Sequence, residues 1–329
     1  PLMTPSPASI RRRRLLLAAG VAAVSLAAVR AQAFPSRPLK ILVGYSAGGG
    51  VDAMARLLAN ALSGPLGQQV VVENRAGASG MIAADLVSKS APDGHTLLLA
   101  ESGLLIASHL GVGRRIDPVA ELTPVAGLFV SPMMLVAHNG FPARTPREFL
   151  AEIKARPGHY SYATPGVGTL QHLAFEMVKA QTGTFVLHIP YRGAAQVVPD
   201  IVSGQVPLGV VSATAGLAQA KAGRLRPLAM LSANRLPGVE DVPALSDAVP
   251  GFSVAPRIHM LAPPGMPQAL VDQLSEAVRG VLSQPQTVLA ANNQGALPTY
   301  LPPATLRTEL VRESQDWERI IKAQKITAA

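Results

Sequence analysis

Short apolar runs alternate with amphipathic ones along the chain from residue 39 onward. Leu39 to Tyr45 has the pattern of a buried strand, and residues 51–62 carry apolar side chains at helical spacing. The unit then repeats, with an expected strand at 69–73, a helix at 80–88 and a strand at 96–100. This alternation predicts an α/β fold built on a mostly parallel sheet with helices on both faces.

A second set of units follows a long predicted strand at residues 125–137. Its expected elements are helix 146–156, strand 160–164, helix 169–181, strand 185–191, helix 194–203, strand 207–212 and helix 214–222. The chain then returns with strand 257–261 and helices 268–282 and 304–325. Helices this late in the chain must pack on a sheet, and the first sheet has a face that its own earlier helices leave uncovered. We therefore expect two α/β lobes that the chain crosses between twice, with lobe 1 at 34–134 and 254–329 and lobe 2 at 135–253.

The N-terminus has the pattern of a cleaved signal peptide. Arg11 to Arg14 precede an apolar run at 15–29, and Ala31-Gln32-Ala33 forms a small-x-small cleavage site. The run of about 15 residues is shorter than the roughly 20 that a membrane-spanning helix needs. We expect residues 1–33 to be removed after Ala33 and the mature protein to be soluble and periplasmic, with Sec and twin-arginine export both open.

Composition excludes several classes of site. The chain has no Cys, which rules out disulfides, thiol nucleophiles and zinc–thiolate sites. Its 7 His show no HExxH or His-x-His spacing, so we expect no metal, and no cofactor-binding motif is complete. The formal net charge is +9, but much of it lies in residues 1–33 and the rest is scattered, so we expect no nucleic-acid partner.

Two glycine-rich turns, each between a predicted strand and a predicted helix, are the candidate functional features. The first runs from Gly44 to Asp52 and contains three consecutive glycines; the second is Thr164 to Thr169. Such turns let the backbone approach a ligand, and the helix that follows presents unpaired N–H groups with a partial positive charge. Each turn could also be an ordinary tight connection. Facing each other across two lobes, the two turns would hold a carboxylate.

An enzyme is the competing interpretation of the first turn. Gly44-x-Ser46-x-Gly48 matches the G-x-S-x-G elbow of serine hydrolases, which would make Ser46 a nucleophile. In those enzymes earlier strands supply the oxyanion loop, whereas here the motif follows the first mature strand. There is no room upstream for that loop, so a serine hydrolase stays a minor alternative.

Several strings in the mature chain resemble the Bug family, the extracytoplasmic receptors of tripartite tricarboxylate transporters. They are the segment Pro35 to Ile41, the GGG-x-Asp turn with Ala55-Arg56, the segment Leu66 to Gly77, Pro92 to Leu98, Gly166-x-Gly168-Thr169-x-x-His172-Leu173, His188 to Gly193 and Ala222 to Ala229. The resemblance spans essentially the whole mature chain. It implies a periplasmic-binding-protein (Venus flytrap) fold, no catalysis, and a carboxylate held between the two turns, partly through ordered water.

The expected ligand-binding residues follow from the two turns and the resemblance. They are Tyr45, Ser46, Ala47, Gly48, Gly49, Asp52, Ser102, Thr164, Gly166, Gly168, Thr169, His172, Val211 and Arg257. Asp52 is more readily explained as a helix N-cap than as a ligand contact. For His172, a backbone hydrogen bond that braces the turn is an alternative to facing the cleft. Tyr191 and Arg192 are expected near the cleft rim.

Three positions depart from the family pattern and bear on the ligand. The usual Thr before the first-turn Asp is Val51, and an Asp common in the second lobe is Val211, which argues against an amino acid as ligand. Arg257 replaces a common Trp and either points into the cleft toward a second polar group of the solute or lies on the surface. Dicarboxylates, tricarboxylates and aromatic acids all stay open.

The expected partners are a small carboxylate and the membrane subunits of a tripartite tricarboxylate transporter, with the receptor itself a monomer. A periplasmic sensor subunit that binds the same solutes for a signalling protein is the alternative, because a docking surface has no local sequence motif.

Overall fold

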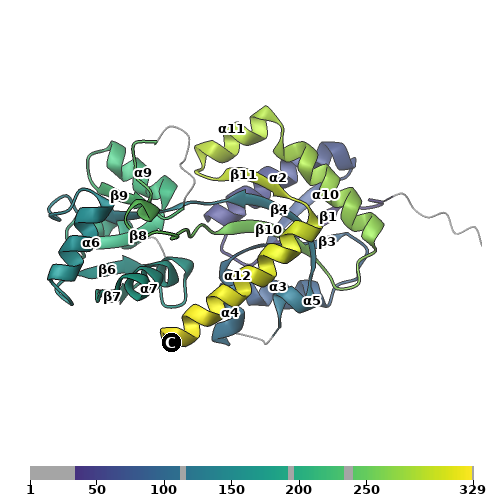
Figure 1. Cartoon of the computed structure of the whole chain (residues 1–329). Helices are drawn as coiled ribbons and strands as arrows, with labels where there is room; N and C mark the ends of the chain where they lie inside the picture. The colour runs from purple at the N-terminus through teal and green to yellow at the C-terminus, as the bar shows by residue number, and fades with distance from the viewer. Residues whose placement is uncertain (1–33, 112–115, 192–195, 233–239, 328–329) are drawn as a thin grey trace, which may run out of the picture. The chain divides into compact units, whose positions relative to one another are not determined.

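The computed structural model describes residues 34–111, 116–191, 196–232 and 240–327. The expected signal peptide at 1–33 and the rim residue Arg192 lie outside the described residues. Within those ranges the fold is α/β, with two sheets that both carry helices on their faces (Figure 1).

The first sheet has six strands in the order β11-β4-β10-β3-β1-β2. Their bounds are β1 Leu39–Val43, β2 Val70–Asn74, β3 Thr96–Glu101, β4 Thr123–Val130, β10 Arg257–Ala262 and β11 Leu297–Leu301. Strands β2, β1 and β3 pair in parallel, whereas β10 is antiparallel to β3 and β4, and β11 is antiparallel to β4. The sheet is therefore mixed: β1, β2, β3 and β4 run in one direction, as expected for βαβ units, whereas β10 and β11 run in the opposite direction. The chain leaves this sheet at the end of β4 and re-enters at the same edge through β10, so β10 must run in the opposite direction.

The second sheet has five strands in the order β7-β6-β8-β5-β9. Their bounds are β5 Met133–Ala137, β6 Ser161–Thr164, β7 Leu187–Pro190, β8 Leu208–Ser212 and β9 Arg226–Met230. Strands β7, β6 and β8 are parallel, and β5 is antiparallel to both β8 and β9. The chain enters this sheet through its antiparallel strand β5, just as it re-enters the first sheet through β10.

Strand register places both glycine turns at the edges where the chain crosses between the sheets. Arg257, the first residue of β10, pairs with the last residue of β4, and Ile258 pairs with Glu101 at the end of β3. In the second sheet Met133, the first residue of β5, pairs with Ser212 at the end of β8. The carboxyl ends of the parallel strands, where α/β proteins bind ligands, therefore lie at the crossing edge of each sheet.

Helices cover both faces of the first sheet (Figure 1). One face carries α2 Gly50–Leu66, α10 Gln268–Leu282 and α11 Pro285–Asn293, which contact one another. The other face carries the short 3-10 helix η1 Ala78–Gly80 and helices α3 Met81–Ser88, α4 Gly103–Leu110, α5 Pro118–Glu121 and α12 Pro303–Ala323. On this second face, Leu42, Leu98 and Leu261 of the sheet pack with Leu306 and Leu310 of α12.

The helices of the second sheet divide in the same way. Helices α6 Pro146–Ala155 and α7 Leu170–Thr182 cover one face, and α8 Val197–Val202 and α9 Ala213–Lys221 cover the other. The two-residue period of β5 shows the division: Met133 and Leu135 pack in the cluster with α6 and α7, whereas Met134 and Val136 pack in the cluster with α8 and α9. The short η2 Leu245–Asp247 lies on the return crossing.

The structure corrects the predicted elements at several points. The expected strand at 125–137 is two strands in different sheets, β4 and β5, separated by Ser131 and Pro132. Helices α4, α5 and α11 and strands β9 and β11 were not predicted. The first five residues of helix α4 are all buried, and the helix is apolar on nearly every side. Its sequence therefore lacks the alternation of apolar and polar faces that predicts a surface helix. Strand β11 contains Pro298, which weakens a strand pattern.

Within the described part of the chain, no helix combines the length and the apolar character needed to cross a membrane.

Candidate functional site

The first turn joins β1 to α2 and presents its backbone to solvent. Residues 46–50 are exposed, whereas Gly44 is buried. A Cβ on Gly44 would lie 2.3 Å from the Cα of Gly80, so only glycine allows the two backbones to approach this closely. Gly48 has φ +82°, which glycine adopts without strain. The sequence places glycine where the turn requires it.

Asp52 holds the first turn from inside. Its carboxylate is buried at 2 % exposure and accepts hydrogen bonds from the Gly48 amide at 2.9 Å, Arg56 Nε at 3.0 Å and Asn74 Nδ2 at 2.8 Å. Burial by itself would raise the pKa of Asp52, but these hydrogen bonds outweigh it and lower the pKa below 3.8. Asp52 is not the N-cap, which is Gly49; it is the third residue of α2 and reaches back to the turn.

The start of α2 leaves backbone donors available. Gly49 makes no side-chain capping hydrogen bond, so no cap side chain satisfies the N–H groups of the first helical turn. The Gly49 amide bonds to Ser46 O at 3.3 Å and the Gly48 amide to Asp52, whereas no hydrogen bond to a described residue engages the amide of Gly50. Exposed amides at a helix N-terminus favour an anion.

Tyr45 connects the first turn to Ser79 and to Glu101 at the end of β3. Its hydroxyl donates to Ser79 O at 3.3 Å and lies against Glu101. Burial and the neighbouring Glu101 raise the pKa of Tyr45 well above 10.0, so the phenol stays protonated. Ser102 is fully buried, and its Oγ accepts from the Arg257 amide at 3.1 Å. Ser102 therefore makes an internal contact in this structure.

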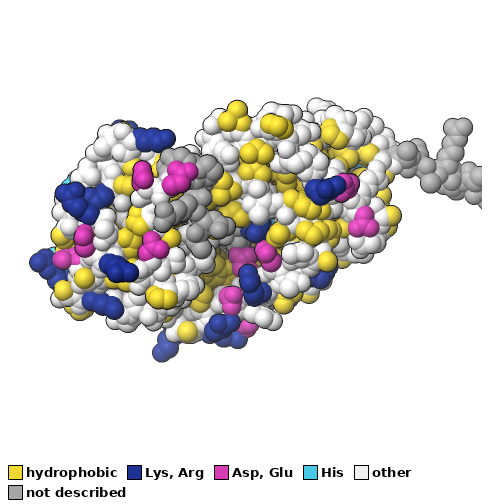
Figure 2. Space-filling model, turned by 45° about the horizontal axis from the view of Figure 1, so that its top comes forward, with side chains coloured by type: hydrophobic (Ala, Val, Ile, Leu, Met, Phe, Trp, Pro, Cys, Tyr) yellow, Lys and Arg dark blue, Asp and Glu magenta, His cyan; other side chains and the backbone are white. Residues whose placement is uncertain are grey.

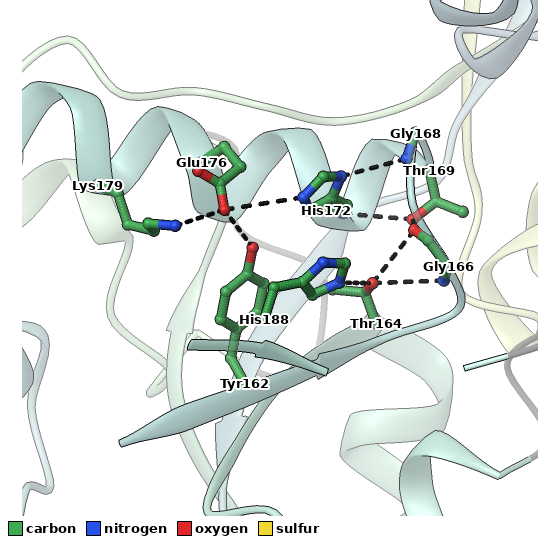
Figure 3. Close-up of polar contacts among 9 residues, drawn as sticks. All are labelled: Tyr162, Thr164, Gly166, Gly168, Thr169, His172, Glu176, Lys179 and His188. Atoms are coloured by element: carbon green, nitrogen blue, oxygen red, sulfur yellow. Dashed lines mark hydrogen bonds and ion pairs between the residues drawn. The ribbon is translucent and has the colours of Figure 1, made fainter. Parts of the chain in front are cut away.

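The second turn, between β6 and α7, is closed by its own side chains (Figure 3). Thr169 is the N-cap of α7 and accepts from the His172 amide, while its hydroxyl donates to Gly166 O at 2.8 Å. Gly166 and Gly168 have φ of +152° and +76°. The Gly168 amide donates to His172 Nδ1 at 3.2 Å, which is the bracing contact that sequence offered as an alternative for this residue.

A buried polar cluster lies behind the second turn (Figure 3). Glu176 Oε1 accepts from Tyr162 Oη at 2.6 Å and Lys179 Nζ at 2.7 Å, and lies 3.7 Å from His172 Nε2. The ring of His188 stacks on that of His172 with centroids 4.0 Å apart, and its Nε2 shares a hydrogen bond of 2.6 Å with Thr164 Oγ1. Sequence reasoning gave no role to Tyr162, Glu176, Lys179 or His188, although His188 stands in one of the family strings.

Burial sets the protonation of the two imidazoles. It lowers the pKa of His172 below 6.5, an effect that the Glu176 carboxylate opposes and Lys179 adds to. Burial, and after it the proximity of His172, lower the pKa of His188 to about 4. Both rings are therefore neutral at pH 7.

The remaining predicted residues lie in different surroundings. Val211 is buried at 5 % exposure in β8, in the cluster with Met134. The Arg257 guanidinium bonds to Glu309 Oε2 at 3.1 Å and to Thr299 O at 3.3 Å. The Tyr191 hydroxyl donates to Asp200 at 2.6 Å. Among the described residues, no hydrogen bond or ion pair joins the first turn to the second.

A cavity of about 300 Å³ lies beside α12 and the crossing segments. Arg257, Met177 and Trp317 line it, together with Glu309, Glu313 and Ser253, and neither glycine turn contributes to its walls. Glu313 accepts a hydrogen bond from Trp317 Nε1 at 3.1 Å. On the face shown in Figure 2, charged side chains of both signs are interspersed and form no large patch of one sign.

Two specific alternatives, Ser46 as a nucleophile and a metal site, can be compared with the described residues. Ser46 is exposed, and its hydroxyl has no histidine or carboxylate partner within the described ranges. Across those ranges, no group of three or more His, Asp or Glu side chains could hold a metal ion.

Comparison with known proteins finds matches over most of the chain. Residues 54–326 match the family described as "Tripartite tricarboxylate transporter family receptor". Protein BugT of Bordetella pertussis is 34% identical over 319 residues, covering 94% of this chain and 97% of BugT. Rpa4515 of R. palustris, solved with adipate, has a TM-score of 0.78 and 31% identity, covering 89% of this chain and 99% of that one. MatC of Rhodopseudomonas palustris, solved with bound malate, has a TM-score of 0.73 and 28% identity, covering 88% of this chain and 100% of MatC.

Proposed function

This chain belongs to the tripartite tricarboxylate transporter family of receptors, which are periplasmic solute-binding proteins of the two-lobe fold, and from that premise we propose that it binds a small carboxylate. We further propose that the two lobes, one built on each sheet, close on the solute and deliver it to the membrane subunits of a transporter. We place the start of lobe 2 before β5 Met133–Ala137 rather than at residue 135, because all of β5 lies in the second sheet. The mature receptor begins after Ala33 and acts as a monomer.

The observation that carries this proposal is the uncapped start of α2 in an exposed glycine turn. A carboxylate that leaves water loses several kcal/mol of solvation unless hydrogen-bond donors replace it. Backbone amides supply such donors, each charge-assisted hydrogen bond contributing about 1.5 to 3 kcal/mol. The Gly50 amide has no described partner, Gly50 is exposed, and a Cβ built on it would meet nothing within 4 Å.

The class of solute follows from the relatives and from the side chains present. Rpa4515 was solved with adipate and MatC with malate, both dicarboxylates. At Val211, where an Asp would suit an ammonium group, this chain has an apolar side chain. Dicarboxylates are therefore the first class to test, with Ser46, Ala47 and Thr169 as further contacts and no chemical conversion of the solute.

A thermal-shift screen over adipate, malate, citrate and benzoate tests the function. A solute at about 100 times its Kd should stabilise the folded protein by roughly 2.7 kcal/mol. Isothermal titration calorimetry then gives the affinity for the solute that shifts the melting temperature most. Absence of any shift, or turnover of a solute by the purified protein, would contradict the proposal.

A matched pair of variants tests the amide of Gly50. Gly50→Pro removes the N–H at the first helical position, which proline tolerates, and the ψ of 167° at Gly49 suits a residue that precedes proline. Loss of one charge-assisted bond should weaken binding about 10- to 100-fold. Gly50→Ala keeps the N–H and should bind within about threefold of the wild type. Equal affinity of the two variants would show that this amide does not contact the solute.

A further inference from the structure

The hydrogen bond from Gly168 fixes the tautomer of His172. The amide N–H can only donate, so His172 Nδ1 at 3.2 Å must accept and carry no proton. In the neutral ring the proton is then on Nε2, the nitrogen that lies 3.7 Å from Glu176 Oε1. The side chain is buried at 6 % exposure, so water has little access to replace either contact.

Protonation of His172 would break this contact. An imidazolium carries N–H groups on both nitrogens and has no acceptor. Two N–H groups would then point at each other across the 3.2 Å between Gly168 and His172. Glycine at position 168 can take up a different backbone conformation more easily than any other residue, because it has no side chain and already adopts a φ of +76°. The turn must therefore change conformation when the ring gains a proton.

The groups that face the two rings come from α7, β6 and β7 (Figure 3). On α7 they are Glu176, which favours the charged ring, and Lys179, which disfavours it. From β6 the phenol of Tyr162 donates to Glu176 and stacks on His188 at 4.8 Å. From β7 comes His188, whose ring lies 4.0 Å from that of His172. Two imidazolium ions at that distance repel, so the stacked pair takes up one proton far more easily than two.

We propose that His172 is a positioning residue for solute binding, whose Nε2-protonated tautomer holds the Gly168 amide and the second turn in the binding conformation, and whose protonation releases them. The proposal rests on the proposed function, because it assigns the second turn to the solute site. It predicts that affinity is constant above the ordinary histidine value and falls as the pH is lowered through the pKa of His172, which burial places below 6.5.

Nuclear magnetic resonance of the solute-free protein tests the tautomer directly. Histidine ring ¹⁵N shifts at about pH 7.5 should show Nδ1 of His172 unprotonated and Nε2 protonated. On acidification the Gly168 amide resonance should move together with the ring. An Nδ1-protonated ring, or a Gly168 amide indifferent to the titration, would overturn the proposal whether or not any carboxylate binds.

Two variants of His172 separate the effect of losing the hydrogen-bond acceptor from the effect of gaining a positive charge. His172→Asn keeps a carbonyl oxygen near the position of Nδ1 and cannot titrate, whereas His172→Leu removes the acceptor. At about pH 7.5 the Asn variant should bind within about threefold of the wild type, and the Leu variant at least about tenfold more weakly. His159→Asn, at an exposed histidine, is the matched control and should behave as the wild type.

The affinity test uses adipate and malate at about pH 7.5 and about pH 5. The wild type should lose up to about tenfold more affinity than His172→Asn per pH unit below the pKa of His172. The ratio of the two proteins cancels the titration of the solute itself. Equal pH profiles would overturn the proposal. If neither protein binds either acid, the proposed function fails instead, and the resonance data still decide the tautomer.

Discussion

At the scale of single residues, close backbone approach decides which glycines are essential. Gly44 and Gly48 both lie in the first turn, but a Cβ added to Gly48 would have nothing within 4 Å, whereas one added to Gly44 would meet Gly80. His259 shows the opposite kind of constraint. It is fully buried in β10, and neither ring nitrogen has a hydrogen-bond partner among the described residues, so burial lowers its pKa to about 4. Such constraints depend on which residues are neighbours in the folded structure, and the sequence alone does not show this.

Gly44→Ala should destabilise the protein, because its Cβ would lie 2.3 Å from a backbone atom that cannot move independently. Overpacking of this kind costs about 1 to 3 kcal/mol. Urea unfolding measures the loss. Gly280→Ala in α10 is the control: nothing lies within 4 Å, so replacing a helical glycine should stabilise by about 0.5 to 1 kcal/mol. A neutral Gly44→Ala would mean that β1 and η1 do not approach as described.

At the scale of elements, the two turns are held by different devices although they occupy equivalent places in their sheets. The first depends on a carboxylate three residues into α2, which satisfies the Gly48 amide and binds Arg56 and Asn74. The second depends on the Thr169 cap and a neutral imidazole. The first helix start therefore keeps free amides, whereas a side chain caps the second.

Asp52→Asn should lower the free energy of unfolding at pH 7 by about 1 to 3 kcal/mol, since hydrogen bonds to a charged group are lost. The pKa of Asp52 is lowered in the folded protein, so its stabilisation is present above 3.8 and is lost as the pH falls through the folded value. Urea unfolding at several pH values should show the difference between wild type and variant shrinking in acid. Asp316→Asn, in an exposed ion pair with Arg319, should change stability by less than about 0.5 kcal/mol.

At the scale of the whole molecule, elements of the two sheets meet away from the crossings as well. Thr214 at the start of α9 donates to Gln294 O at 2.8 Å, beyond the end of α11, and Leu110 of α4 lies against Gly168. One apolar cluster continues from Leu306 in α12 to Phe175 in α7. A change in the arrangement of the two lobes would have to break or rearrange these contacts.

Saturation with the solute found in the thermal screen should reduce the radius of gyration measured by small-angle X-ray scattering, because a two-lobe receptor closes on its ligand. Gly50→Pro at the same solute concentration should scatter like the free protein if its weaker binding leaves the site empty. An unchanged radius in the saturated wild type would show that binding occurs without closure.

Features that arise from residues close together in the chain could be predicted before the fold was known. Periodicity located most helices and strands, and residues 268–282 were predicted with the bounds that α10 has. Glycines after β1 and β6 marked both turns, and ordered strings such as Leu66 to Gly77 identified the family. These signals are local, because a helix or strand that buries one face repeats its apolar residues at a fixed period.

Contacts between distant residues could not be predicted from local patterns, because they depend on how the elements pack. The antiparallel place of β10, the contact of Arg257 with Glu309 and the stacking of His172 on His188 join residues that lie far apart in the chain or on different elements. Arg257 was a candidate ligand contact, and His188 had no assigned role, because a side chain's partner depends on how the sheets and helices pack. The free energy of these contacts comes from burial and hydrogen bonding that exist only once the fold has formed.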